Sequence, residues 1–128
     1  MSGRAKVLIL DDSPLILEMT RAFLGDAGFD VLTALNLSEL ERVLDTEPPD
    51  VVLVDVNMPE AFGDDVAMVL RSARKVAAPI YLYSNLDVEE LATRARDAEV
   101  EGFISKRQGF PVLVERLQQI LAVKQAHS

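Results

Sequence analysis

The feature that most constrains the fold of this chain is a unit that occurs five times: a short apolar run followed by apolar residues at helical spacing. The runs are Val7–Leu10, Val51–Val54, Ile80–Tyr83 and Gly102–Ser105, together with a weaker one at Asp30–Thr33. The helical patterns pass through Leu15 and Met19, Leu40 and Val43, Val66 and Leu70, Leu91 and Ala95, and Leu113 and Leu117. Apolar runs without alternation are typical of strands covered on both faces. The repeat predicts an α/β fold, an open doubly wound sheet of five parallel strands with five helices.

Two of the expected helices carry boundary signals. Ser13 followed by Pro14 is typical of an N-cap residue with proline at the first helical position. The pair Pro48–Pro49 is expected to stop the second helix, because a residue before proline is disfavoured in helical conformation. The first boundary places Asp11 and Asp12 in the turn between the first strand and its helix.

Length and composition limit the classes of function. A chain of 128 residues predicts one domain, residues 1–128, with a core from about 5 to 123 and short disordered ends. With 13 basic and 21 acidic residues the net charge is -8, which disfavours binding to nucleic acid or to anionic lipid. The absence of cysteine excludes disulfides and thiolate sites. No apolar run approaches the roughly 18 residues of a membrane span, so we expect a cytoplasmic protein without nucleic-acid or membrane partners.

Charged or hydroxyl side chains that could take part in chemistry follow four of the five predicted strands. Asp11 and Asp12 end the first, Asp55 the third, Ser84 the fourth and Lys106 the fifth. Each residue alone has an ordinary explanation as a turn, cap or surface residue. Ligands of open α/β sheets bind outside the carboxyl ends of the strands, where all of these residues are expected. Their joint placement therefore predicts one functional site.

The residue types point to a cation and a phosphate. Three carboxylates about 4 Å apart repel by roughly 1 to 4 kcal/mol per pair, and a bound cation would offset this repulsion. Mg²⁺ suits such oxygen ligands, and it leaves coordination positions for water and phosphate oxygens. Lys106 and Ser84 would then hold the anion. A carboxylate in this setting can attack phosphorus and form an acyl phosphate.

The same residues resemble the receiver domains of two-component response regulators, single-domain chemotaxis regulators among them, over essentially the whole chain. The resemblance rests on Asp11–Asp12, the segment 55–59 (Asp-Val-Asn-Met-Pro) with Gly63 after it, Ser84, and Phe103 three residues before Lys106. It implies a flavodoxin-like sheet with the strand order 2-1-3-4-5.

The resemblance implies a role for each residue of the predicted site. Asp55 would accept a phosphoryl group from a histidine kinase or a histidine phosphotransfer domain. Asp12, Asp55 and the backbone carbonyl of Asn57 would hold Mg²⁺, and Asp11 would help through water. The chain would then be a signalling module that assists its own phosphoryl transfer and hydrolysis, rather than an enzyme.

The resemblance also implies a switch. Ser84 would move to bond the phosphoryl group, and Phe103 would follow it inward. This movement would alter the surface formed by the fourth helix, the strand 102–105 and the last helix. A downstream protein target would bind that surface, and activation would allow a homodimer to form.

Two departures from the family pattern leave questions open. Arg107 follows Lys106 where the family usually has proline after a cis peptide bond, and a cis bond before a residue other than proline costs about 2.5 to 4 kcal/mol. The Lys106 loop therefore carries this strain or takes a trans path. Asn85 and Leu86 follow Ser84, where many members have small or acidic residues, so the lifetime of the phosphoryl group is not predicted.

Two other functions compete with this interpretation. A receiver-like module that binds partners without phosphorylation is the main alternative, and the Arg107 departure motivates it. A flavin carrier or a dehalogenase-like phosphatase fits less well. The acidic turn after the first strand would repel a flavin phosphate in the absence of metal. The phosphatase needs a second acid two residues after its nucleophile, where this chain has Ser13 and Pro14.

Overall fold

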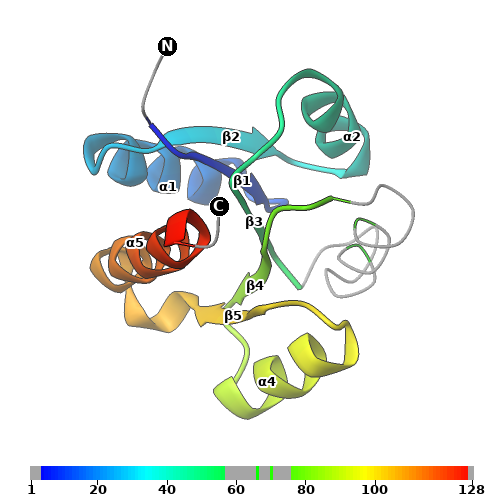
Figure 1. Ribbon diagram of the computed structural model, residues 1–128. Helices are drawn as coiled ribbons and strands as arrows, with labels where there is room; N and C mark the ends of the chain where they lie inside the picture. The colour runs from blue at the N-terminus through cyan, green and yellow to red at the C-terminus, as the bar shows by residue number, and fades with distance from the viewer. Residues whose placement is uncertain (1–3, 57–65, 67–69, 71–75, 127–128) are drawn as a thin grey trace.

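Five parallel strands form the single sheet of the computed structural model, which describes residues 4–56, 66, 70 and 76–126. The strands are β1 (Lys6–Leu10), β2 (Asp30–Ala34), β3 (Val51–Val54), β4 (Ile80–Ser84) and β5 (Gly102–Ser105). Their order across the sheet is β2-β1-β3-β4-β5 (Figure 1). The predicted strands and the order implied by the family resemblance are confirmed.

Four α-helices lie in the described part of the chain, together with one short 3₁₀ turn. They are α1 (Pro14–Asp26), α2 (Leu37–Thr46), α4 (Val88–Asp97), α5 (Phe110–Ala126) and the 3₁₀ turn η1 (Lys106–Gln108). The remaining predicted helix passes through Val66 and Leu70, which are helical and buried. The rest of that helix lies outside the described residues. None of the described helices is long and apolar enough to cross a membrane.

The helix boundaries follow local hydrogen-bonding chemistry. The Ser13 hydroxyl accepts the Ile16 N–H at 3.3 Å and caps α1, with Pro14 at the first helical position as predicted. Asn36 caps α2 by accepting the Glu39 N–H at 2.9 Å. The helix α2 ends at Thr46, just before the proline pair.

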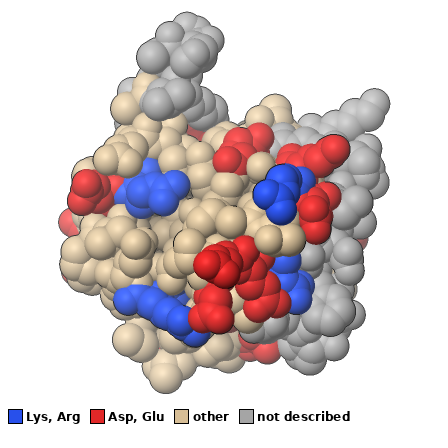
Figure 2. Space-filling view, turned by 90° about the horizontal axis from the view of Figure 1, so that it is seen from below, with Lys and Arg blue, Asp and Glu red and all other residues tan. Residues whose placement is uncertain are grey.

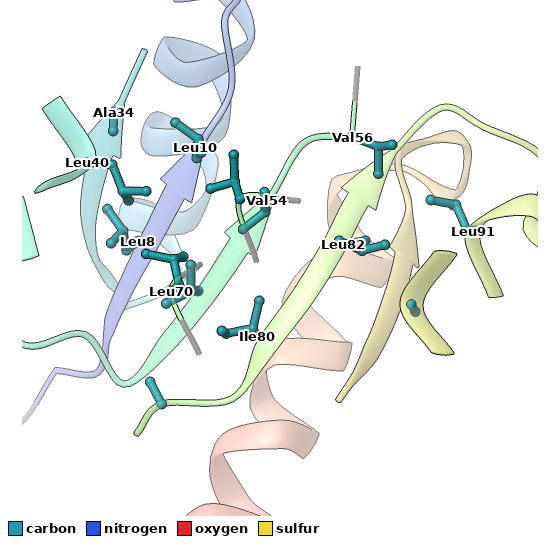
Figure 3. Close-up of a cluster of buried hydrophobic side chains, with 14 residues drawn as sticks. Leu8, Leu10, Ala34, Leu40, Val54, Val56, Leu70, Ile80, Leu82 and Leu91 are labelled. Atoms are coloured by element: carbon teal, nitrogen blue, oxygen red, sulfur yellow. The ribbon is translucent and has the colours of Figure 1, made fainter. Parts of the chain in front are cut away.

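Alternation along the strands separates two apolar cores, one on each face of the sheet. On β1, Val7 and Ile9 face the core covered by α1 and α5, whereas Leu8 and Leu10 face the core covered by α2 and α4. Figure 3 shows the second core, in which Leu40 and Leu91 extend from the helices toward the sheet. Burial of both faces holds the strands in register.

The register brings the ends of β1 and β3 to the same level. Leu10, the last residue of β1, pairs with Ala34 of β2 and with Val54 of β3. From β1 the chain continues to β2, which lies on one side of β1 in the sheet, whereas β3 lies on the other side. The direction in which strands are added to the sheet therefore reverses between β1 and β3. Open α/β sheets bind ligands at such a reversal.

Two leucines on α1 test how far this packing determines stability. We expect Leu17→Ala, at a position 5% exposed, to lower the free energy of unfolding by about 2 to 5 kcal/mol through lost burial and a cavity. Leu15→Ala, at a position 64% exposed, should change it by less than about 0.5 kcal/mol. Urea denaturation followed by circular dichroism measures both, and equal losses would contradict the described orientation of α1.

Candidate functional site

Asp11 and Asp55 extend the sheet by one step beyond β1 and β3. The Asp11 N–H donates to the Ala34 carbonyl at 3.1 Å, and the Asp55 N–H donates to the Leu10 carbonyl at 2.9 Å. These bonds fix both backbones at the sheet edge. Both side chains are nearly covered, since Asp11 is 2% exposed and Asp55 is 7% exposed.

Asp12 completes an acidic cluster with these two residues. Each of Asp11, Asp12 and Asp55 offers a carboxylate oxygen, and these oxygens lie within 4.8 Å of one another. Asp12 is exposed, so the cluster opens to solvent on its side. Three hard oxygen donors with an open side fit a divalent cation that keeps water or phosphate in its shell. The structure thus brings together the three predicted acidic residues.

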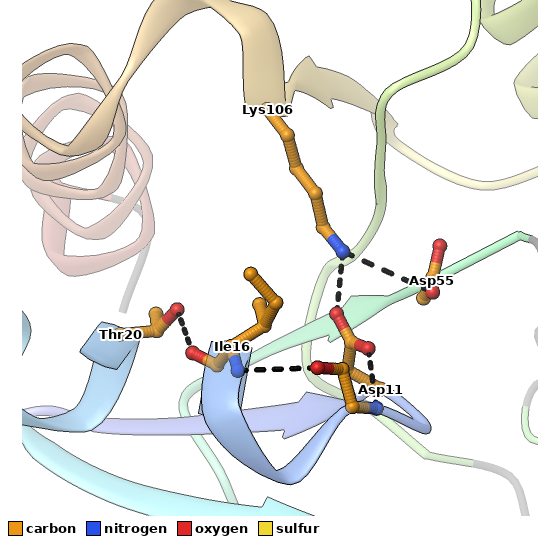
Figure 4. Close-up of polar contacts among 6 residues, drawn as sticks. Asp11, Ile16, Thr20, Asp55 and Lys106 are labelled. Carbon is orange, nitrogen blue, oxygen red and sulfur yellow. Dashed lines mark hydrogen bonds and ion pairs between the residues drawn. The ribbon is translucent and has the colours of Figure 1, made fainter. Parts of the chain in front are cut away.

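Lys106 reaches the same cluster from the far end of the chain. Its Nζ lies 2.5 Å from Asp11 Oδ2 and 3.8 Å from Asp55 Oδ2 (Figure 4). The Lys106 side chain is only 12% exposed, so these charges interact with little screening by water. Sequence analysis placed Lys106 at this site but did not identify Asp11 as its direct partner.

The loop that carries Lys106 takes a trans path. The described residues contain no cis peptide bond, and Lys106 is the first residue of η1. The Ser105 hydroxyl accepts the Arg107 N–H at 3.1 Å and caps this turn. The Arg107 side chain points outward and forms an ion pair of 3.0 Å with Asp87, the residue just before α4. Arginine in place of proline is therefore compatible with an ammonium group at the acidic cluster.

The two carboxylate oxygens of Asp11 have different partners. One binds the Lys106 ammonium group, and the other binds the backbone of the turn that leads into α1. Asp11 Oδ1 accepts the Ser13 N–H at 3.0 Å, and Ser13 caps α1. The carboxylate therefore connects Lys106 with the start of α1. Figure 4 shows this contact beside the bond from the buried Thr20 hydroxyl to the Ile16 carbonyl, at 2.7 Å within α1.

Tyr83, which sequence analysis placed only in the strand run Ile80–Tyr83, is a further member of the site. It is buried in the core between the sheet and α5, and the Lys106 Nζ lies over its ring, 5.4 Å from the centroid. Burial, with a smaller contribution from the Asp11 carboxylate, raises the pKa of the Tyr83 phenol to about 12. The phenol is therefore neutral at physiological pH.

The two predicted switch residues lie on neighbouring strands. Ser84 ends β4, is fully buried, and pairs with Ser105 of β5. Phe103 of β5 is half-buried, pairs with Leu82, and packs against the core beneath α2 and α4. The predicted ligand Asn57 lies outside the described residues, as do Met58, Pro59 and Gly63.

Comparison with known proteins adds sequence and structural relatives. The family described as response regulator receiver domain matches residues 7–118. Transcriptional regulatory protein KdpE of Mycobacterium tuberculosis is 32% identical over 112 residues, which make up 88% of this chain and 49% of that protein. Response regulator protein PilR of Pseudomonas aeruginosa is 33% identical over 122 residues, 94% of this chain and 26% of that protein.

The solved structures agree with this match. Chemotaxis protein CheY4 of Vibrio cholerae superposes with a TM-score of 0.83 and 29% identity, covering 93% of this chain and all of that one. A CheY-like receiver domain protein of Methanospirillum hungatei has a TM-score of 0.86 at 20% identity, covering 98% of this chain. The chain spans about half the length of KdpE and about a quarter of PilR.

The acidic cluster predicts that a divalent cation stabilises the fold. Titration with magnesium chloride at constant ionic strength should raise the midpoint of thermal unfolding. A ligand that binds only the folded state adds about 2.7 kcal/mol to the free energy of unfolding when its concentration is roughly 100 times its Kd. Asp12→Asn should largely abolish the increase, whereas Asp26→Asn, which removes an exposed carboxylate at the end of α1, should retain it. Equal responses from both variants would refute the site.

Proposed function

Because this chain belongs to the response regulator receiver domains, a family of signalling modules whose general role is to accept a phosphoryl group, we propose that Asp55 is the acceptor. The observation that carries the proposal is the position of its carboxylate, at the end of the central strand β3, where it clusters with two other aspartates and lies 3.8 Å from Lys106. Histidine kinases or histidine phosphotransfer domains are the donors expected for this family.

The proposed reaction transfers a phosphoryl group from a histidine nitrogen of the donor to a carboxylate oxygen of Asp55. An Asp55 oxygen attacks the phosphorus of a phosphorylated histidine, and the imidazole leaves with the electron pair of the broken P–N bond. Lys106, 3.8 Å from Asp55, offsets the negative charge of the phosphoryl oxygens. We propose Mg²⁺ as the cation of the acidic cluster, with Asn57 as a further ligand; when bound, it supplies positive charge to the same oxygens.

The switch that we propose runs through β4 and β5. The Ser84 hydroxyl bonds the phosphoryl group, and Phe103 moves further into the core that it already borders. Phe103 belongs to the strand between α4 and α5, so this movement changes the surface that those helices share. Figure 2 shows the side on which α4 lies, where acidic side chains gather near the centre and basic ones flank them. We propose a protein target for this mixed surface.

Asp55→Ala tests the acceptor. We expect the wild-type chain to gain the mass of one phosphoryl group on incubation with acetyl phosphate and magnesium, and the variant to gain none, because the nucleophile is absent. Intact-protein mass spectrometry measures the gain. Asp97→Asn, which alters an exposed carboxylate at the end of α4, is the control and should be modified like wild type. Uptake by the Asp55 variant at the wild-type rate would exclude this acceptor.

Beryllofluoride, a mimic of the phosphoryl group, tests the switch and the main alternative. With magnesium, we expect it to shift the amide resonances of Ser84 and Lys106 and, through the sheet, that of Phe103, and to leave the spectrum of Asp55→Ala unchanged. A response to magnesium without a response to beryllofluoride would instead favour a module that binds partners without phosphorylation. NMR spectra of the isotope-labelled full chain provide the measurement.

An apolar stripe beside the site is our proposed contact for the phosphodonor. Leu15, Met19 and Phe23 occur at every fourth position of α1 and are 64%, 46% and 39% exposed. Residues four apart share a helix face, and α1 begins immediately after the acidic turn. A donor domain that packs on this stripe would lie next to Asp55. Exposed apolar patches of this kind are typical of protein contacts.

Met19→Glu tests this contact. Transfer from a phosphorylated histidine phosphotransfer domain should slow by about tenfold or more, because a buried unpaired carboxylate at an interface costs more than 1.4 kcal/mol. Transfer from acetyl phosphate should not change. Val88→Glu places the same charge at an exposed apolar position of α4 and should affect neither rate. Slowing by Val88→Glu alone would place the contact on α4 instead.

A further inference from the structure

We propose that Tyr83 is the positioning residue of Lys106: the face of its ring holds the ammonium group at the acidic cluster, and this contact sets the rate at which Asp55 is phosphorylated. The part that concerns the rate rests on the proposed function. The part that concerns the position of Lys106 does not, and it is tested without any phosphate donor.

The contact between the two side chains has the geometry of a cation–π interaction. The Lys106 Nζ lies 5.4 Å from the centroid of the Tyr83 ring, within the limit of about 6 Å for such contacts. Tyr83 is 3% exposed and the Lys106 side chain 12% exposed. Removal of both groups from water strengthens the attraction.

The ring is the fixed partner of this pair. Tyr83 lies in β4, a strand paired on both sides, and its backbone is in register with Ile104 of β5. Its side chain belongs to the core that includes Leu113 and Leu117 of α5. Lys106, by contrast, extends from the three-residue turn η1, whose next residues, Arg107 and Gln108, are exposed.

The ring also differs from the carboxylates in its response to charge. Asp11 and Asp55 attract Lys106, but a cation held by these aspartates would repel the ammonium group and weaken that attraction. The quadrupole of a neutral ring does not change when a cation enters the cluster. Tyr83 therefore provides the contact that persists while the charges around Lys106 change.

Tyr81 offers a matched control. It lies two residues earlier on β4, borders the same core, and carries the same phenol. Burial raises the pKa of the Tyr81 phenol, and the charged groups that act on it are Arg116 and Glu101. Loss of aromatic packing alone would appear in both the Tyr81 and the Tyr83 variant, and less at the half-buried Tyr81, whereas a loss of lysine positioning would appear only at Tyr83.

The first experiment locates Lys106 by NMR in the full chain. An aromatic ring shifts the resonances of protons above its face upfield, so the methylene group next to Lys106 Nζ should be shifted. Tyr83→Leu should remove this shift, with and without magnesium, whereas Tyr83→Phe and Tyr81→Leu should retain it. A shift that survives in Tyr83→Leu would overturn the proposal.

The second experiment measures the rate of phosphorylation by acetyl phosphate. Tyr83→Phe should react like wild type, and Tyr83→pentafluorophenylalanine, which keeps the shape of the ring but reverses its quadrupole, should react about threefold to thirtyfold more slowly. The comparison of these two ring variants also tests the positioning role if Tyr83→Leu does not fold. Equal rates for Phe and its fluorinated form would overturn the positioning role. If wild type took up no phosphate, the proposed function would fail, and the NMR result would still decide the position of Lys106.

Discussion

The buried carboxylate of Asp11 is the constraint on which the site depends. At 2% exposure this charge is too costly to leave unpaired, and Lys106 compensates it from 95 positions further along the chain. The pairing requires β5 and its turn η1 to approach β1 across the two strands that lie between them. The other oxygen of Asp11 bonds the turn that starts α1. One side chain thus connects the first strand, the first helix and the end of the last strand.

The placement of the site was predictable from the sequence because it follows from topology. Parallel strands end at one edge, so Asp11, Asp12, Asp55 and Lys106 had to gather there once the five apolar runs were identified as strands. The start of α1 was also predictable, because Ser13 and Pro14 act within a single turn. These features depend on local chemistry or on the order of elements along the chain.

Other features depend on tertiary distances that no sequence pattern carries. Tyr83 alternates with Leu82 in the manner of any core residue, and only the folded structure brings Lys106 over its ring. The Lys106–Arg107 peptide is trans, as is usual before a residue other than proline, and the hydroxyl that caps the turn comes from Ser105. Asn36 could have been identified, since an asparagine three residues before Glu39 is a recognisable helix start.

The alternation along β4 has a consequence for how such a chain can change over evolutionary time. Tyr83 faces the layer of α5, and Ser84 follows at the end of the strand, so two adjacent residues have different environments. An insertion of one residue within β4 would turn every later side chain of the strand to the opposite face. Lys106 would lose its aromatic neighbour and the serine would leave its position in the same step. Length variation among descendants of this chain should therefore accumulate in the loops and spare this strand.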